Sequence, residues 1–146
     1  MGLLTAEHIE LDSQACSKRA LITELANLLT SIDADAVMEV VMAREQLGST
    51  GIGHGVAIPH GRMADLPTLM LALARHREGV DFDAIDESPV HIVVLLLVPD
   101  SDDRQHLELL AQLARSLQDA SFRQQIMQAE SRDAIAALFD DKVHLD

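Results

Sequence analysis

His60 is the residue whose type and setting are best suited to covalent chemistry. It lies near the end of the stretch STGIGHGVAIPHGRM, residues 49–63, between a proline and a glycine. Pro59 fixes its own φ and holds Ile58 extended, so the backbone enters His60 in a stiff conformation, and Gly61 adds no side chain beyond it. A neutral imidazole is a good nucleophile near pH 7. The stretch therefore predicts either an accessible nucleophilic histidine or one whose ring only hydrogen-bonds a turn.

The small residues before His60 favour a phosphate site over a nucleotide site. Phosphoryl transfer depends mainly on positioning and on hydrogen-bond donors for three equatorial oxygens. Amides and hydroxyls around Ser49, Thr50 and Gly51 could supply such donors. Neither glycine-rich nucleotide motif occurs, because the chain has no G-x-x-x-x-G-K-S/T run and residues 51–56 do not fit G-x-G-x-x-G.

Two distant residues fit the same phosphate chemistry. Arg44 shares the apolar stripe of a predicted helix with Val40 and Val41, where an arginine is costly unless it meets an anion. The alternative is an arginine that extends to the surface at a helix end. His106 begins the inward face of a later helix, whose amino end attracts anions; the alternative is a polar first-turn residue. Together with His60 and the loop, these residues predict one phosphate site.

Apolar periodicity predicts helices on both sides of a group of strands. The first helix has its apolar residues between 21 and 29 and a cap at Ser17, and the second runs from Asp33 or Asp35 to Gly48. The apolar stripe of the second helix also includes Leu47.

After Pro99 we expect only helices. The first of them has an apolar stripe made of Leu107, Leu110, Leu113, Ala114 and Leu117, and its N-cap is Asp100, Ser101 or Asp102. Ser121 and Ser131 are the predicted N-caps of two shorter helices.

Strands are predicted between these helical regions. Residues 56–58 and 69–74 indicate short strands, and the unbroken apolar run 92–98 indicates a central strand that is buried on both faces. A short strand and a turn are expected within residues 79–89. The predicted fold is an α/β sandwich, with a small mixed β-sheet flanked by helices, in a single domain over residues 1–146.

Composition excludes several classes of function. The 146 residues carry 24 acidic and 11 basic side chains, a net charge of −13, which disfavours nucleic acid as a partner. Three phenylalanines are the only aromatic residues, too few for a pocket that stacks sugars or bases. The longest apolar run is too short to span a membrane and no signal peptide is recognisable. Cys16 is the only cysteine, which suits the cytoplasm.

The remaining candidates for chemistry receive structural interpretations. We expect four histidines to be exposed to solvent: His8, His76, His91 and His144. Cys16 is predicted to be a partly buried structural residue, and the role of His54 is left open. No cofactor is expected.

Three segments resemble the IIA domains (EIIA) of the bacterial sugar phosphotransferase system (PTS), fructose/mannitol type. They are MAREQLGSTGIGHGVAIPHGR, FDAIDESPVHIVVLLLVP and HLELLAQLARSL. Within that family the sequence is most similar to the stand-alone nitrogen-regulatory members, over residues 17 to beyond 140. The resemblance implies the α/β fold above. It also implies that His60 accepts phosphate, on either ring nitrogen, from an HPr-like carrier (NPr), with Arg44 and His106 lining the site.

The leading hypothesis is a cytoplasmic phosphocarrier that regulates target proteins according to its phosphorylation state, a phosphotransferase component rather than a free-standing enzyme. It is favoured because the chain ends without a IIB or IIC module and lacks aromatic residues for a sugar pocket. The main alternative is the IIA subunit of a fructose/mannitol-type permease, which would pass phosphate to a IIB domain. A metal-dependent hydrolase with His54, His60 and His106 as ligands, and a binding module without phosphorylation, are more distant alternatives.

Overall fold

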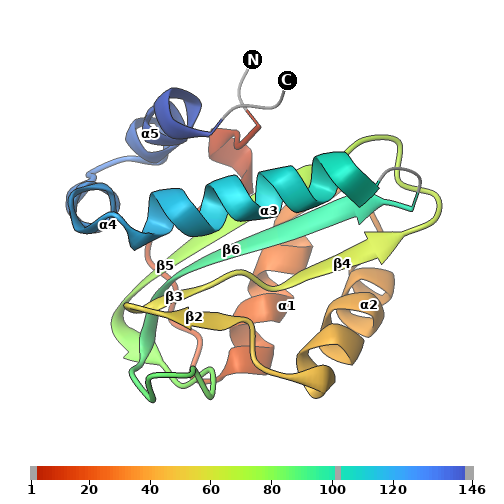
Figure 1. The fold of residues 1–146 in the computed structure, drawn as a ribbon, viewed down its shortest axis with the longest axis horizontal. Coiled ribbons are helices and arrows are strands. Elements are labelled where there is room, and N and C mark those ends of the chain that lie inside the picture. The colour runs from red at the N-terminus through yellow and green to blue at the C-terminus, as the bar shows by residue number, and fades with distance from the viewer. Residues whose placement is uncertain (1–2, 101–102, 144–146) are drawn as a thin grey trace.

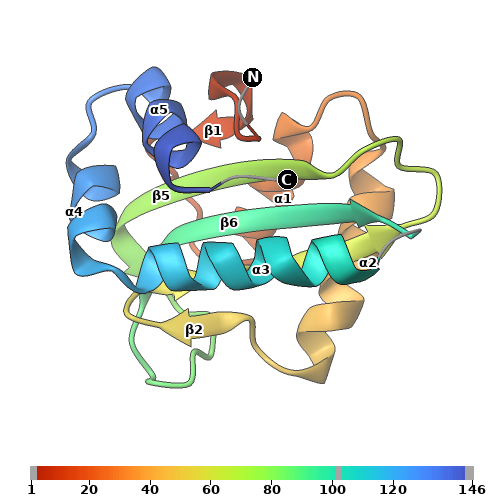
Figure 2. The ribbon, with the colours of Figure 1, turned by 45° about the horizontal axis from the view of Figure 1, so that its top comes forward.

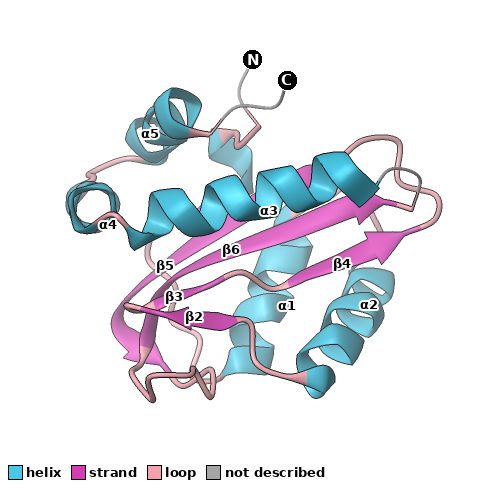
Figure 3. Cartoon of the chain, in the orientation of Figure 1, coloured by secondary structure: helices cyan, strands magenta, loops and turns pink. Residues whose placement is uncertain are grey.

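The computed structural model describes residues 3–100 and 103–143, so the prediction for His144 and two of the expected caps, Ser101 and Asp102, lie outside the described residues. The described elements, in chain order, are η1 Ala6–His8, β1 Ile9–Glu10, α1 Lys18–Leu28, α2 Ala34–Leu47, β2 Gly51–Gly53, β3 Val56–Ala57, β4 His60–Met63, β5 Met70–Val80, β6 Val90–Pro99, α3 Asp103–Gln118, α4 Ala120–Gln128 and α5 Arg132–Lys142 (Figures 1 and 3).

Strand β6 is the centre of a six-stranded mixed sheet with the order β1-β5-β6-β3-β2. One edge of β6 pairs antiparallel with β5. Its other edge pairs in parallel first with β3 and then with β4, in register from His60 opposite Leu96 to Met63 opposite Pro99. Because the carbonyl of Pro59 accepts from the amide of Leu96, β3 and β4 form one interrupted strand along β6.

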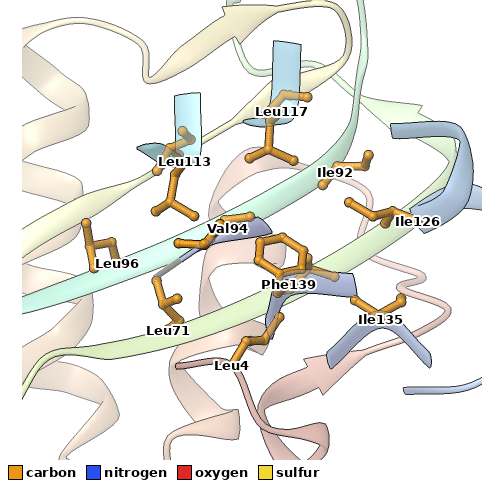
Figure 4. Close-up of a cluster of buried hydrophobic side chains, with 14 of the residues drawn as sticks. Leu4, Leu71, Ile92, Val94, Leu96, Leu113, Leu117, Ile126, Ile135 and Phe139 are labelled. Atoms are coloured by element: carbon orange, nitrogen blue, oxygen red, sulfur yellow. The ribbon is translucent and has the colours of Figure 1, made fainter. Parts of the chain in front are cut away.

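Helices cover both faces of this sheet, which confirms the predicted sandwich. Figures 1 and 2 show α3, α4 and α5 on one face and α1 and α2 on the other. From residue 92 to 98, alternate residues of β6 enter the two cores: Ile92, Val94, Leu96 and Val98 on the α3 side, and Val93, Leu95 and Leu97 on the α1 side. Val90 also lies on the α1 side, because the register shifts at this end of the strand pair. Figure 4 shows Val94 and Leu96 facing Leu113 of α3. The central strand is buried on both faces, as the run 92–98 predicted.

Most predicted helix boundaries are confirmed. The hydroxyls of Ser17 and Ser131 accept from the amides three residues later, and Asp33 and Gly48 cap the two ends of α2. The prediction for Ser121 is wrong: Asp119 is the N-cap of α4, and its carboxylate accepts from the amide of Ser121.

Other local expectations are corrected by the tertiary structure. Leu47 is 85% exposed because it lies in the last turn of α2, and Leu107 is 62% exposed while Leu109 fills the core instead. The segment between β5 and β6 forms no additional strand. Three histidines that were expected to be exposed are not: His76 is buried, with its Nε2 2.7 Å from the carbonyl oxygen of Ala15, and His8 and His91 are half-buried. Cys16, which was expected to be partly buried, is exposed.

Arg75 is a buried cation that ties β5 to the end of α4. It is 1% exposed, and its guanidinium donates to the carbonyls of Leu11, Ile126 and Ala129 at 2.6–3.0 Å. The last two carbonyls belong to the C-terminal turn of α4, where the helix dipole favours a positive charge. Burial, followed by the charge of Arg77, lowers the pKa of Arg75, while Asp12 opposes the shift.

We predict that Arg75→Met lowers the free energy of unfolding by about 2–4 kcal/mol, because it leaves several buried carbonyls without donors. Urea denaturation at neutral pH measures the change. Arg77→Met is the control: Arg77 is 60% exposed and contacts Asp12 at 3.4 Å, so its loss should cost about 0.5 kcal/mol or less. Equal stabilities of the two variants would contradict a structural role for Arg75.

Candidate functional site

A cleft of about 430 Å³ brings Arg44, His60 and His106 together, from three segments far apart in the sequence. It lies where α2, β4 and α3 meet along the edge of β6. Its other lining residues are Val40, Gly61, Arg62, Leu96, Val98, Leu107 and Leu110. The cleft therefore combines cationic or imidazole side chains with an apolar wall.

His60 is oriented by the backbone that precedes it. It is the first residue of β4, is half-buried, and its Nδ1 lies 2.8 Å from the carbonyl oxygen of Ile58. A carbonyl can only accept, so Nδ1 carries the proton and Nε2 keeps the lone pair. The hydrogen bond between the His60 ring and a turn, which was the alternative to a nucleophilic role, is therefore present. It selects the tautomer whose Nε2 is unprotonated, so it is compatible with a nucleophilic role.

Gly61 allows α2 to approach the strand beside His60. A Cβ atom at Gly61 would overlap Cγ1 of Val40, on α2. Arg44 follows Val40 by one helical turn. The absence of a side chain at Gly61 thus brings the Arg44 turn of α2 against β4.

Arg44 is held at the C-terminal end of α2. Its Nη1 donates to the carbonyl of Gly48 at 2.9 Å, while the half-buried side chain lines the cleft. A guanidinium has five N–H donors, so this hydrogen bond leaves others for a ligand. An arginine at a helix end was the alternative to a phosphate-binding role for Arg44. The structure shows that Arg44 lies at the helix end and also lines the cleft.

His106 lies in the first turns of α3 and is 7% exposed. Its Nδ1 is buried and has no hydrogen-bond partner among the residues that the structure describes. Leaving a buried polar atom unpaired costs about 1–3 kcal/mol, and such atoms are rare in folded proteins. This unpaired nitrogen makes His106 unusual for a buried histidine, and the same side chain lines the cleft of His60.

The loop residues predicted to bind phosphate do not line this cleft. The Ser49 hydroxyl donates to the carbonyl of Phe82 and accepts from the Gly51 amide. Thr50 donates to the buried carboxylate of Glu45 through its hydroxyl, and through its amide at 3.4 Å. These donors hold the loop that follows α2, and their contribution to phosphate binding stays a prediction.

Sequence reasoning missed Arg62 and the apolar wall of the cleft. Arg62 lies two residues after His60 on β4, and alternate residues of a strand share a face. The spacing H-G-R was the available signal. Leu107 was assigned to the core, yet it is an exposed part of the wall beside His106.

His54 lies outside the site. It is exposed in the β2–β3 turn with a φ of 58°, and it lines a different cleft. Across residues 3–100 and 103–143, no group of three or more histidine, cysteine or acidic side chains is arranged to hold a metal ion. The ligand set His54, His60 and His106 is therefore not brought together.

No helix within the described segments is long and apolar enough to cross a membrane.

The family model described as "Phosphoenolpyruvate-dependent sugar phosphotransferase system, EIIA 2" matches residues 2–142. A nitrogen regulatory protein of Pseudomonas aeruginosa is 39% identical, with 86% of this chain and 84% of the relative covered. A fructose-specific EIIA component of Haloferax volcanii is 33% identical, with coverages of 88% and 86%.

Solved structures agree with these matches. The nitrogen regulatory protein IIA-Ntr of Neisseria meningitidis superposes with a TM-score of 0.90 at 41% identity, over 94% of this chain and 96% of that one. The mannitol IIA protein of Escherichia coli gives 0.77 at 22% identity, over 92% and 97%, a likeness of fold. This chain belongs to the EIIA type 2 family of the phosphoenolpyruvate-dependent sugar phosphotransferase system.

Proposed function

We propose that this protein is a phosphocarrier and regulator of the nitrogen-related phosphotransferase branch, acting in the cytoplasm. His60 accepts a phosphoryl group from a phosphohistidine of an HPr-like carrier, and target proteins distinguish the two phosphorylation states. The observation that carries the proposal is the shared cleft of Arg44, His60 and His106, with Nδ1 of His60 bonded to a backbone carbonyl. The relatives named nitrogen regulatory proteins support the regulatory branch.

The geometry supports an in-line transfer to Nε2 of His60. The lone pair of Nε2 forms the new N–P bond, and the donor's N–P bond breaks with its electron pair returning to the donor imidazole. Nδ1–H of His60 stays bonded to the Ile58 carbonyl, which stabilises the positive character that the ring gains. Arg44 balances the negative charge of the equatorial oxygens, and His106 donates a hydrogen bond to them.

A permease subunit that passes phosphate to a IIB domain is the second candidate. The fructose-specific relative of Haloferax volcanii supports it. Incubation of the phosphorylated protein with fructose- and mannitol-type IIB domains separates the two functions, since a regulator should keep its phosphate on the timescale in which a permease subunit loses it.

The first prediction concerns His60. Incubation with Enzyme I, an HPr-type carrier and phosphoenolpyruvate should add one phosphoryl group that is labile to acid and stable to base, as a phosphoramidate is. His60→Ala should abolish the labelling, whereas the control His54→Ala should keep it, because His54 lines another cleft. Labelling that persists in the His60 variant would refute the assignment.

The second prediction concerns His106. His106→Ala should slow phosphotransfer by up to about 100-fold, because it removes a donor for the transferring group. Since Nδ1 of His106 has no partner among the described residues, folding should be preserved; urea denaturation and single-turnover transfer provide the two measurements. His106→Gln keeps a donor and should recover part of the rate. An unchanged rate in both variants would leave His106 as an ordinary first-turn residue.

The third prediction concerns Arg44. Arg44→Met should change the free energy of unfolding by about 1 kcal/mol or less, since one exposed hydrogen bond to Gly48 is lost, and should strongly slow transfer. Arg44→Lys should lie between, because an ammonium lacks the planar fork that engages two oxygens. Full transfer by a destabilised but folded Arg44→Met variant would show a purely structural role.

A further inference from the structure

A second cleft, of about 400 Å³, lies at the end of the sheet where α4 meets the β2–β3 turn (left in Figure 1). Its volume falls within the range of about 300–1,000 Å³ that is usual for small-molecule sites. It shares no lining residue with the cleft of His60. Any ligand here would therefore be bound by different side chains from those that serve phosphotransfer.

The charge of this second cleft is opposite to that of the whole chain. Arg77, Arg123, His54 and His91 line it, and no acidic side chain does so among the described residues. The protein as a whole has a net charge of −13. Two guanidinium groups and two imidazoles therefore face this cleft, and Asp12, which contacts Arg77 at 3.4 Å, lies outside its lining.

Two carboxylates that contact residues of this cleft are already engaged in hydrogen bonds. Asp12 accepts from Arg75 and Arg77 at 3.4 Å. Asp86 accepts from the amides of Ser88 and His54, and these hydrogen bonds lower its pKa. Of the two arginines of the cleft, only Arg77 takes part in these contacts, through Nε, and its guanidinium has further N–H donors.

The donors of the cleft are also positioned by the fold. Arg123 donates through Nη1 to the carbonyl of Leu117 at 3.0 Å, which anchors one end of its guanidinium. His91 contacts the carbonyl of His76 through Nδ1 at 3.0 Å, so Nδ1 is the protonated nitrogen. A guanidinium held in this way loses less conformational entropy when it binds a ligand.

We propose that this cleft binds a small organic anion, with a phosphate or carboxylate held by Arg77 and Arg123. A guanidinium engages either group through two parallel N–H donors. Met127, which is half-buried, provides apolar surface for the carbon skeleton of the ligand. Such a ligand would bind independently of the phosphoryl group on His60, because the two clefts use separate residues.

The test is a titration of the ¹⁵N-labelled, unphosphorylated full chain with glycerol 3-phosphate and, separately, with citrate, followed by amide chemical shifts. At least one anion should give saturable shifts at residues 54–55, 91–92 and 123–128, while uncharged glycerol should give none. Shifts near Arg44 and His60 report the other cleft and are evaluated separately, so failure here leaves the proposed function intact.

Arg123→Gln and Arg77→Gln should each weaken binding at the second cleft by about tenfold. Because Arg77 is exposed, its variant remains informative even if the change at Arg123 disturbs α3. Arg19→Gln removes the same charge from an exposed position on α1 and should leave binding unchanged. Shifts that never saturate, or that survive both cleft variants, would overturn the proposal, as would binding of a polyglutamate peptide without either small anion.

Discussion

The parallel pairing of β4 with β6 is the interaction on which the site depends. It sets His60 opposite Leu96, in a strand that is interrupted at Pro59 and then continues along the same edge of β6. The interruption turns the carbonyl of Ile58 toward the imidazole, where it contacts Nδ1. One strand edge therefore determines both where the imidazole lies and which of its nitrogens is free.

The surrounding elements depend on how closely they can approach this edge. Gly61 has no side chain, and α2 packs against β4 there through Val40. The same helix then presents Arg44, whose hydrogen bond to Gly48 ties it to the helix end. On the other face, α3 follows β6 and carries His106 with a buried, unpaired Nδ1. The site is assembled from the ends of elements whose interiors form the two cores.

Local signals made a large part of this predictable. Caps such as Ser17 and Asp33, and the apolar run of β6, follow from hydrogen bonding and burial within short segments. The convergence of Arg44, His60 and His106 was also predicted, because each has a recognisable local setting. Arg44 lies on an apolar helix stripe, His60 between a proline and a glycine, and His106 near the amino end of a helix. Arg75 was not predicted, since its partners are backbone carbonyls, some more than 50 residues away, which leave no trace in the side-chain pattern. The hydrogen bonds of the Ser49 and Thr50 hydroxyls to the Phe82 carbonyl and the Glu45 carboxylate were not predicted either, while their role in phosphate binding stays a prediction.

The central claim is that a backbone carbonyl selects the nitrogen of His60 that carries phosphate. Nitrogen and phosphorus NMR of the phosphorylated protein, labelled with ¹⁵N in its histidine rings, tests this most directly. The account predicts a phosphorus–nitrogen coupling at Nε2 of His60, with Nδ1 still protonated. Coupling at Nδ1 would require the hydrogen bond to Ile58 to be broken, and would contradict the account.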